Sequence, residues 1–218
     1  MDTNILLLYL VVSFFYILSP GPAVFLAIAN GMTAGIKPLI ASTFGNVVGL
    51  FILSLVSILG LGAIVIASST LFLIVKVIGA AYLIYLGAKQ IRQSTLHFKA
   101  LDEASNIRAD VTRKERSIAA YYHEGFFLAV TNPKPILFFI AIFPQFLNAE
   151  SPIAPQFLIL TLSFMTLSFL SLFSYGYLGK TAKILFSNEL RMQWFHRVTG
   201  GLFIMMGLGL LKLKNSTM

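Results

Sequence analysis

Cysteine is absent from this chain of 218 residues, and the absence excludes several kinds of chemistry. The protein can form no disulfide, no thiolate metal site and no cysteine nucleophile. Its three histidines, His97, His123 and His196, are not spaced as metal ligands usually are. We therefore expect no metal site, no redox chemistry and no cofactor.

Charged residues are also scarce, whereas apolar residues are abundant. Only 11% of the residues are charged, 57% are hydrophobic, and the mean hydropathy is +0.85, which indicates an integral membrane protein. Uncharged stretches run from 3 to 36 and from 38 to 75. Each is longer than the roughly 20 residues that one helix needs to cross the hydrocarbon, so the second must hold more than one span.

Hydropathy predicts six transmembrane helices in two groups of three. The predicted spans are 4–31, 38–66, 69–90, 117–146, 154–178 and 195–213. The one long polar stretch lies between the third and fourth spans, and we expect it to be a charged cytoplasmic linker. The predicted organisation is a first three-helix repeat at 1–89, the linker at 90–117 and a second three-helix repeat at 118–218.

Lys and Arg residues are distributed unevenly between the two ends of these spans. Most of the sixteen follow the first, third or fifth span, whereas Lys212 and Lys214 lie at the opposite end. Because cytoplasmic loops carry an excess of Lys and Arg, both chain termini should face outward. The same bias accounts for the net charge of +8, so we expect no nucleic-acid partner.

Two proline pairs interrupt the first and fourth spans at corresponding places, in Ser19-Pro20-Gly21-Pro22 and Asn132-Pro133-Lys134-Pro135. Proline inside a helix removes a backbone donor at a cost of about 3 kcal/mol, and lipid offers no water in compensation. Residues 76–80 of the third span also match residues 197–201 of the sixth. We therefore predict an all-α membrane protein built as a 3+3 inverted repeat, with its first and fourth helices broken by Pro-x-Pro.

The residues around the breaks predict a binding site for a zwitterion. Ser19 and Asn132 should cap half-helices that begin at Pro20 and Pro133, because each precedes a proline. Freed amides after a break suit a carboxylate, and freed carbonyls before it suit an ammonium. The expected amides are those of Gly21, Ala23, Lys134 and Ile136, and the expected carbonyls are those of Tyr16, Leu18, Ala129 and Thr131. The alternative is that the prolines only kink two helices.

Three further polar residues are candidates for this site. Lys134 would either complement the substrate carboxylate or pair with helix carbonyls. Asn46, about halfway along the second span, must bond either to a neighbouring helix or to the substrate. Glu124 is either the carrier of a coupling proton or an interfacial charge beside His123. The predicted substrate-binding residues are Ser19, Pro20, Gly21, Pro22, Ala23, Asn46, Asn132, Pro133, Lys134 and Pro135.

Small residues form a stripe along the second span. Ala41, Gly45 and Gly49 recur at four-residue spacing, which lets another helix approach closely. Such a stripe packs within one chain as readily as between two, so the stripe is also compatible with a homo-oligomer.

Four motifs follow one another in order along the chain. They are Ser19-Pro20-Gly21-Pro22, Val75-Lys76 with residues 79–87, Asn132-Pro133-Lys134 with Pro144-Gln145-Phe146, and Trp194 with Arg197, Gly200 and Gly201. With these motifs the sequence resembles the LysE/RhtB family of bacterial amino-acid exporters over nearly its whole length. The resemblance implies efflux across the inner membrane, driven by the proton motive force. Two positions depart from the family pattern: Ala23 stands where relatives often have Asp or Asn, and Pro135 follows the third motif. The loss of an acid at position 23 favours a neutral substrate.

We therefore expect a multi-pass transporter that exports an amino acid in exchange for protons from a bacterial inner membrane. Its partners would be the small-molecule substrate, protons and the lipid bilayer. One alternative is a carrier of another solute or of a metal ion, although the spans lack the acids that hard cations require. An enzyme is disfavoured because the spans offer no acid and base pair. A non-transporting subunit that binds a partner through the linker is a third alternative.

Overall fold

The computed structural model describes residues 3–67, 69–92, 116–148, 151–179, 181 and 189–212, and all regular structure in these ranges is helical. The helices are α1 (Thr3–Leu18), α2 (Pro22–Thr33), α3 (Ile36–Ala67), α4 (Ser69–Arg92), α6 (Ile118–Thr131), α7 (Pro133–Leu137), the π-helix η1 (Phe138–Ile142), the 3-10 helix η2 (Phe143–Phe146), α8 (Ile153–Tyr177) and α10 (Glu189–Lys212). The predicted all-α class is confirmed for these ranges. The predicted linker falls mostly outside the described residues.

Four candidate spans follow from helix length and hydropathy in these ranges. α3 and α8 are each long and apolar enough to cross a membrane, and α1 with α2, and α6 with the helical segments that follow it, qualify as bent pairs. The axes within the two bent pairs differ by 59° and 47°. α4 and α10 have 24 residues each and so reach about 36 Å, which is long enough to cross the hydrocarbon. The count of six spans stays a prediction.

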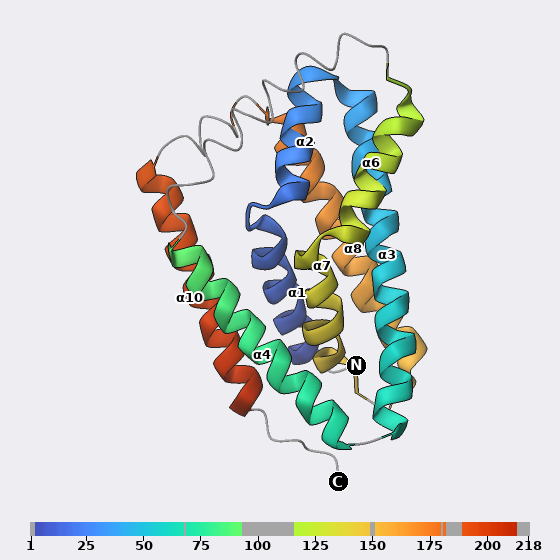
Figure 1. Cartoon of the computed structure of the whole chain (residues 1–218), viewed down its shortest axis with the longest axis vertical. Coiled ribbons are helices and arrows are strands. Elements are labelled where there is room, and N and C mark those ends of the chain that lie inside the picture. The colour runs from blue at the N-terminus through green and yellow to red at the C-terminus, as the bar shows by residue number, and fades with distance from the viewer. Residues whose placement is uncertain are drawn as a thin grey trace.

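Helices from the two halves of the chain pack against each other. α3 lies along α6, α8 lies along α1 and α2, and α4 lies along α10. In Figure 1 the pair of α4 and α10 flanks a bundle of the other helices, which α4 contacts through η1 and α3. α1 begins and α10 ends at one end of the molecule, and α3 and α6 begin at the opposite end. The termini of the described chain therefore lie at the same end.

The predicted stripe of small residues packs within the chain, against α6. A Cβ atom added to Gly45 would lie 2.0 Å from the carbonyl oxygen of Tyr122, and one added to Gly49 would lie 2.7 Å from the Cβ of Ala129. From the other side, a Cβ on Gly125 would lie 1.9 Å from the carbonyl oxygen of Ser42. Only glycine allows the α3 and α6 backbones to approach this closely.

We expect Gly125→Ala to destabilise the protein by about 3 kcal/mol, because the added methyl group forces α3 and α6 apart. The matched control is Gly60→Ala in α3, where an added Cβ meets no atom within 4 Å. That change should be neutral or stabilising, by up to about 1 kcal/mol, since alanine favours helix. Thermal unfolding of the two variants in detergent measures the difference. Equal unfolding temperatures would show that the two helices are not held at this distance.

Buried apolar side chains form two clusters of unequal size. The aromatic cluster contains the rings of Tyr9, Tyr16, Phe138, Phe139, Phe143, Phe146, Phe157, Phe164 and Phe203. The aliphatic cluster contains Val24, Ala27, Ile28, Leu39 and Leu172. The aliphatic cluster lies toward the end where α3 begins, and the aromatic cluster extends toward the end where α1 begins. The two broken helices meet between them.

Candidate functional site: a pocket between two broken helices

The first break separates α1 from α2 at residues 19–21. Ser19 still belongs to the end of α1, since its amide donates to the Phe15 carbonyl at 3.1 Å. Gly21 is the N-cap of α2, with an extended backbone at φ −164° and ψ −178°. A residue before proline is driven out of the helical region, so α2 can begin only at Pro22. The prediction that Ser19 caps a helix beginning at Pro20 is therefore wrong.

The second break has the predicted cap. Asn132 is extended, with φ −75° and ψ 120°, and its side-chain oxygen accepts a hydrogen bond of 3.0 Å from the Lys134 amide. The Ile136 amide is bonded to the Asn132 carbonyl at 3.4 Å. The prediction that the amides of Lys134 and Ile136 are free for a carboxylate is wrong, because Asn132 itself satisfies both.

Loss of this cap should have a measurable cost. Asn132→Ala leaves the Lys134 amide without its acceptor, and we expect a loss of about 1 kcal/mol, or about 3 °C in Tm. Asn132→Ser is the matched control, because serine caps helices nearly as well as asparagine. Thermal unfolding in detergent should place the serine variant close to wild type. A serine variant that unfolds as early as the alanine variant would show that the cap contributes nothing.

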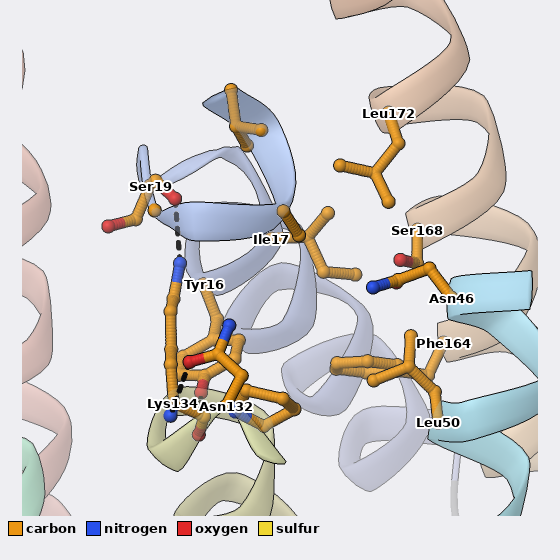
Figure 2. A pocket seen from close by; sticks show the side chains of 14 residues that line it. Tyr16, Ile17, Ser19, Asn46, Leu50, Asn132, Lys134, Phe164, Ser168 and Leu172 are labelled. Carbon is orange, nitrogen blue, oxygen red and sulfur yellow. Dashed lines mark hydrogen bonds between the residues drawn. The ribbon is translucent and has the colours of Figure 1, made fainter. Parts of the chain in front are cut away.

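Lys134 joins the two breaks. Its ammonium donates a hydrogen bond of 2.6 Å to the Ser19 carbonyl and lies 4.8 Å from the centre of the Tyr16 ring. Figure 2 shows this side chain running from α7 to the end of α1. The Tyr16 hydroxyl in turn donates to the Lys134 carbonyl. A carbonyl oxygen and an aromatic face together stabilise a cation, which explains how a charged side chain is held here.

A small pocket of about 50 Å³ opens beside this bridge. Its lining comes from both breaks and from α3 and α8. The predicted site residues that line it are Ser19, Gly21, Ala23, Asn46, Asn132, Lys134 and Pro135. The remaining predicted residues, Pro20, Pro22 and Pro133, shape the backbone next to it. Such a volume holds one or two water molecules, whereas ligand pockets usually measure about 300 to 1,000 Å³. The pocket is therefore smaller than an amino acid.

Side chains outside the set of predicted binding residues complete the pocket. They are Tyr16, Ile17, Val24, Leu50, Phe164, Ser168 and Leu172. Three of these lie on α8, at four-residue spacing, so one face of that helix forms a wall. The many hydroxyl groups of the fifth span were the available signal, but only tertiary packing selects Ser168 among them.

Asn46 and Leu18 both have partners that bear on the predictions. The Asn46 amide nitrogen lies 3.5 Å from the Gly125 carbonyl, a long hydrogen bond to α6, while the same side chain lines the pocket. Both predicted roles of Asn46 are thus compatible with its position. The Leu18 carbonyl accepts a hydrogen bond of 3.0 Å from the Tyr175 hydroxyl, so it is not free as predicted.

Glu124 lies away from the pocket. Its carboxylate pairs with Arg116 at 3.3 Å near the start of α6, where both side chains are about one-quarter exposed, at 26% each. Arg116 also lies 4.7 Å from the centre of the Tyr121 ring. This arrangement is compatible with an interfacial charge, the plainer of the two predicted roles, and gives it Arg116 as a partner.

The backbone after the second break departs from the α-helix in a way that the sequence did not indicate. The π-helix η1 and the 3-10 helix η2 follow α7 directly. The Ser57 hydroxyl of α3 donates to the Phe139 carbonyl inside η1. π-Helical turns occur mostly in short pieces at functional sites, and this one carries Phe138, which packs on Tyr16 with ring centres 4.5 Å apart.

The chain is similar over most of its length to a known family and to several bacterial membrane proteins. The family described as LysE type translocator matches residues 14–213. An uncharacterized membrane protein of Vibrio cholerae is 30% identical over 97% of both chains. The homoserine/homoserine lactone efflux protein of Salmonella typhimurium is 29% identical over 91% of this chain and 92% of its own. The leucine efflux protein of Salmonella choleraesuis is 34% identical over 81% and 83%.

No solved structure matches the chain. The family match covers both breaks, α3, α8 and the whole of α10. The chain therefore belongs to the LysE type translocator family, as its sequence motifs had suggested.

Proposed function

We propose that the protein is a secondary exporter that exchanges a neutral amino acid, or a related metabolite, for protons across a bacterial inner membrane. The observation that carries this proposal is the pocket between the two breaks, which Lys134 bridges by bonding to the Ser19 carbonyl. A cation site in a mostly apolar lining that also carries Asn46 and Ser168 suits a zwitterion. The named relatives are efflux proteins for homoserine or its lactone and for leucine, which supports both the direction and the neutral substrate.

The proposed scaffold is a 3+3 inverted repeat of six spans with both termini outside. Support comes from the way the halves pack, because α3 lies on α6, α8 on α1 and α2, and α4 on α10. These pairs join the second span to the fourth, the fifth to the first and the third to the sixth. A twofold axis that relates the two halves exchanges the pair of α3 and α6 with that of α8 and the α1–α2 span. The same axis maps the pair of α4 and α10 onto itself.

The unequal clusters on either side of the pocket suggest how access alternates. Toward the end where α3 begins, the pocket meets the smaller aliphatic cluster through Val24 and Leu172. Toward the other end it meets the larger aromatic cluster through Tyr16 and Phe164. Lys37 marks the first end as cytoplasmic by the excess of Lys and Arg there. Substrate would thus enter through the smaller aliphatic cluster and leave once the aromatic cluster opens.

Uptake into liposomes that contain the purified protein tests the function. A panel of labelled neutral, basic and acidic amino acids is supplied outside, with and without an acidic interior. Neutral amino acids should accumulate only when protons can leave in exchange. Protein-free liposomes give the background. Movement of no amino acid by folded protein would contradict the proposed function.

A double variant tests the site separately from the function. Pro22→Ala with Pro133→Ala removes the two prolines that hold Gly21 and Asn132 extended. It should allow helix across both breaks and so remove the pocket, while folded protein is still recovered. We expect accumulation to fall to the background of protein-free liposomes. Full activity of this variant would contradict the assignment of the site to the two breaks.

A further inference from the structure

An ammonium group already occupies the cation site of this pocket, and it belongs to the protein. The Nζ atom of Lys134 lies 2.6 Å from the Ser19 carbonyl and over the Tyr16 ring. A substrate with a free α-ammonium would seek the same carbonyl and the same aromatic face. We propose that Lys134 carries the coupled proton, and that its ammonium and the substrate ammonium compete for the Ser19 carbonyl. This inference rests on the proposed exchange of substrate for protons.

Few other titratable groups around Lys134 could carry the coupled proton. Tyr16 of α1, Tyr82 of α4 beside it and Tyr175 of α8 are phenols, which stay protonated at neutral pH. α2 and α3 contribute no ionisable side chain to the pocket lining, and Glu124 of α6 is paired with Arg116 outside it. In the part of the chain that the structure describes, Lys134 is the one ammonium or carboxylate that lines the pocket.

The surroundings of Lys134 favour loss of its proton when substrate binds. No described carboxylate lies within ion-pair distance of its ammonium, so only the dipole of a carbonyl and a ring hold the charge. A second ammonium on the same carbonyl would repel the first. Once Lys134 is neutral, its amine has a lone pair that can accept a hydrogen bond from the substrate ammonium.

The exchange is balanced in atoms and charge. When the pocket opens to the cytoplasm, the Nζ–H bond of Lys134 breaks, its proton passes to water on that side, and the substrate ammonium takes its place at Ser19. When the pocket opens outward, a proton from outside binds Nζ, the restored ammonium returns to the Ser19 carbonyl, and the substrate leaves. No bond within the substrate changes. One proton enters for each substrate exported.

The side chain of Lys134 packs against the glycine of the first break. A Cβ on Gly21 would lie 3.5 Å from its Cδ and 3.8 Å from its Nζ, so Lys134 packs along the backbone of the first break. Gly21 of the first break and Lys134 of the second hold equivalent positions. The lysine side chain thus fills the space beside the glycine. When the ammonium releases Ser19, the link between α7 and the end of α1 is lost.

Proton release on binding tests the proposal directly. Purified protein in weakly buffered detergent solution is mixed with saturating leucine, and a pH dye follows the protons. We expect about one proton per bound leucine, and leucine affinity that rises with pH, since the protonated lysine opposes binding. Leucine that binds with no proton release would overturn the proposal while leaving the exporter in place. Leucine uptake into liposomes, measured in parallel, establishes whether the proposed function itself holds.

Two variants assign the proton. Glu124→Gln should release protons and accumulate leucine as wild type does, and loss of proton release in this variant while leucine still binds would overturn the proposal. Lys134→Gln should bind leucine without releasing a proton and without dependence on pH. Should this variant fail to fold, Lys134→Arg keeps the charge and the hydrogen bond but cannot lose its proton. Accumulation of leucine driven by a pH gradient in either Lys134 variant would overturn the proposal.

Discussion

Liposomes that contain the protein are expected to accumulate a neutral amino acid when their interior is made positive, even with no pH gradient. Exchange of one proton for one zwitterion moves one positive charge across the membrane in each cycle. A charge that crosses 100 mV gains about 2.3 kcal/mol, so the accumulation ratio should rise about 50-fold. The measurement is uptake of labelled leucine into liposomes with a potassium diffusion potential set by valinomycin, at equal pH on both sides.

The sign and the size of this response distinguish different substrates. An inside-negative potential of the same size should suppress uptake, and protein-free liposomes should show neither effect. A cationic amino acid exchanged for one proton moves no net charge, so its uptake should ignore the potential. Uptake of leucine that responds to a pH gradient but not to the potential would contradict the exchange of one proton for one zwitterion.

The sequence predicted the long helices well because hydropathy and proline are local signals. The second predicted span, 38–66, corresponds to α3 at Ile36–Ala67, and the fifth, 154–178, corresponds to α8 at Ile153–Tyr177. The sixth, 195–213, missed the first turns of α10, which begins at Glu189. Those turns are polar, and a hydropathy window ends where a helix continues into polar surroundings.

The sequence predicted the helix cap at the second break better than that at the first. Asn132 caps its helix as expected because the cap depends on two adjacent residues. At the first break the second proline decides the outcome, since it forces Gly21 into an extended conformation. The bond between Lys134 and the Ser19 carbonyl matches the predicted pairing with helix carbonyls. The sequence alone does not distinguish this pairing from a contact with substrate, because it does not show that the two breaks lie side by side.

The residues that form the wall of the pocket could not be predicted from the sequence. Tyr16 and Phe164 are two of many aromatic residues in an apolar chain, and nothing local separates them from rings that only fill space. Their role depends on which helices meet, and so on the close contact of α3 with α6 that Gly125 permits. The π-helix η1 likewise depends on partners such as Ser57 that accommodate its carbonyls.

Ala23→Asp is expected to change the substrate preference from neutral toward cationic amino acids. Ala23 lines the pocket together with Lys134, and no described carboxylate lines it. A second positive charge about 6 Å from the lysine costs about 3 kcal/mol at an effective dielectric constant of 20, and a carboxylate at position 23 offsets that cost. The ratio of lysine to leucine uptake into liposomes should therefore rise about 100-fold.

Ala23→Asn is the matched control, because its side chain has nearly the same size as that of aspartate but carries no charge. If charge decides selectivity, the asparagine variant keeps the wild-type preference for leucine. The aspartate should also hold Lys134 in its protonated form, so accumulation of leucine under a pH gradient should fall in that variant alone. An equal gain of lysine uptake in both variants would attribute selectivity to the shape of the pocket instead. On this proposal, the charge at one position that lines the pocket with Lys134 would set both which amino acid enters and whether a proton leaves in exchange.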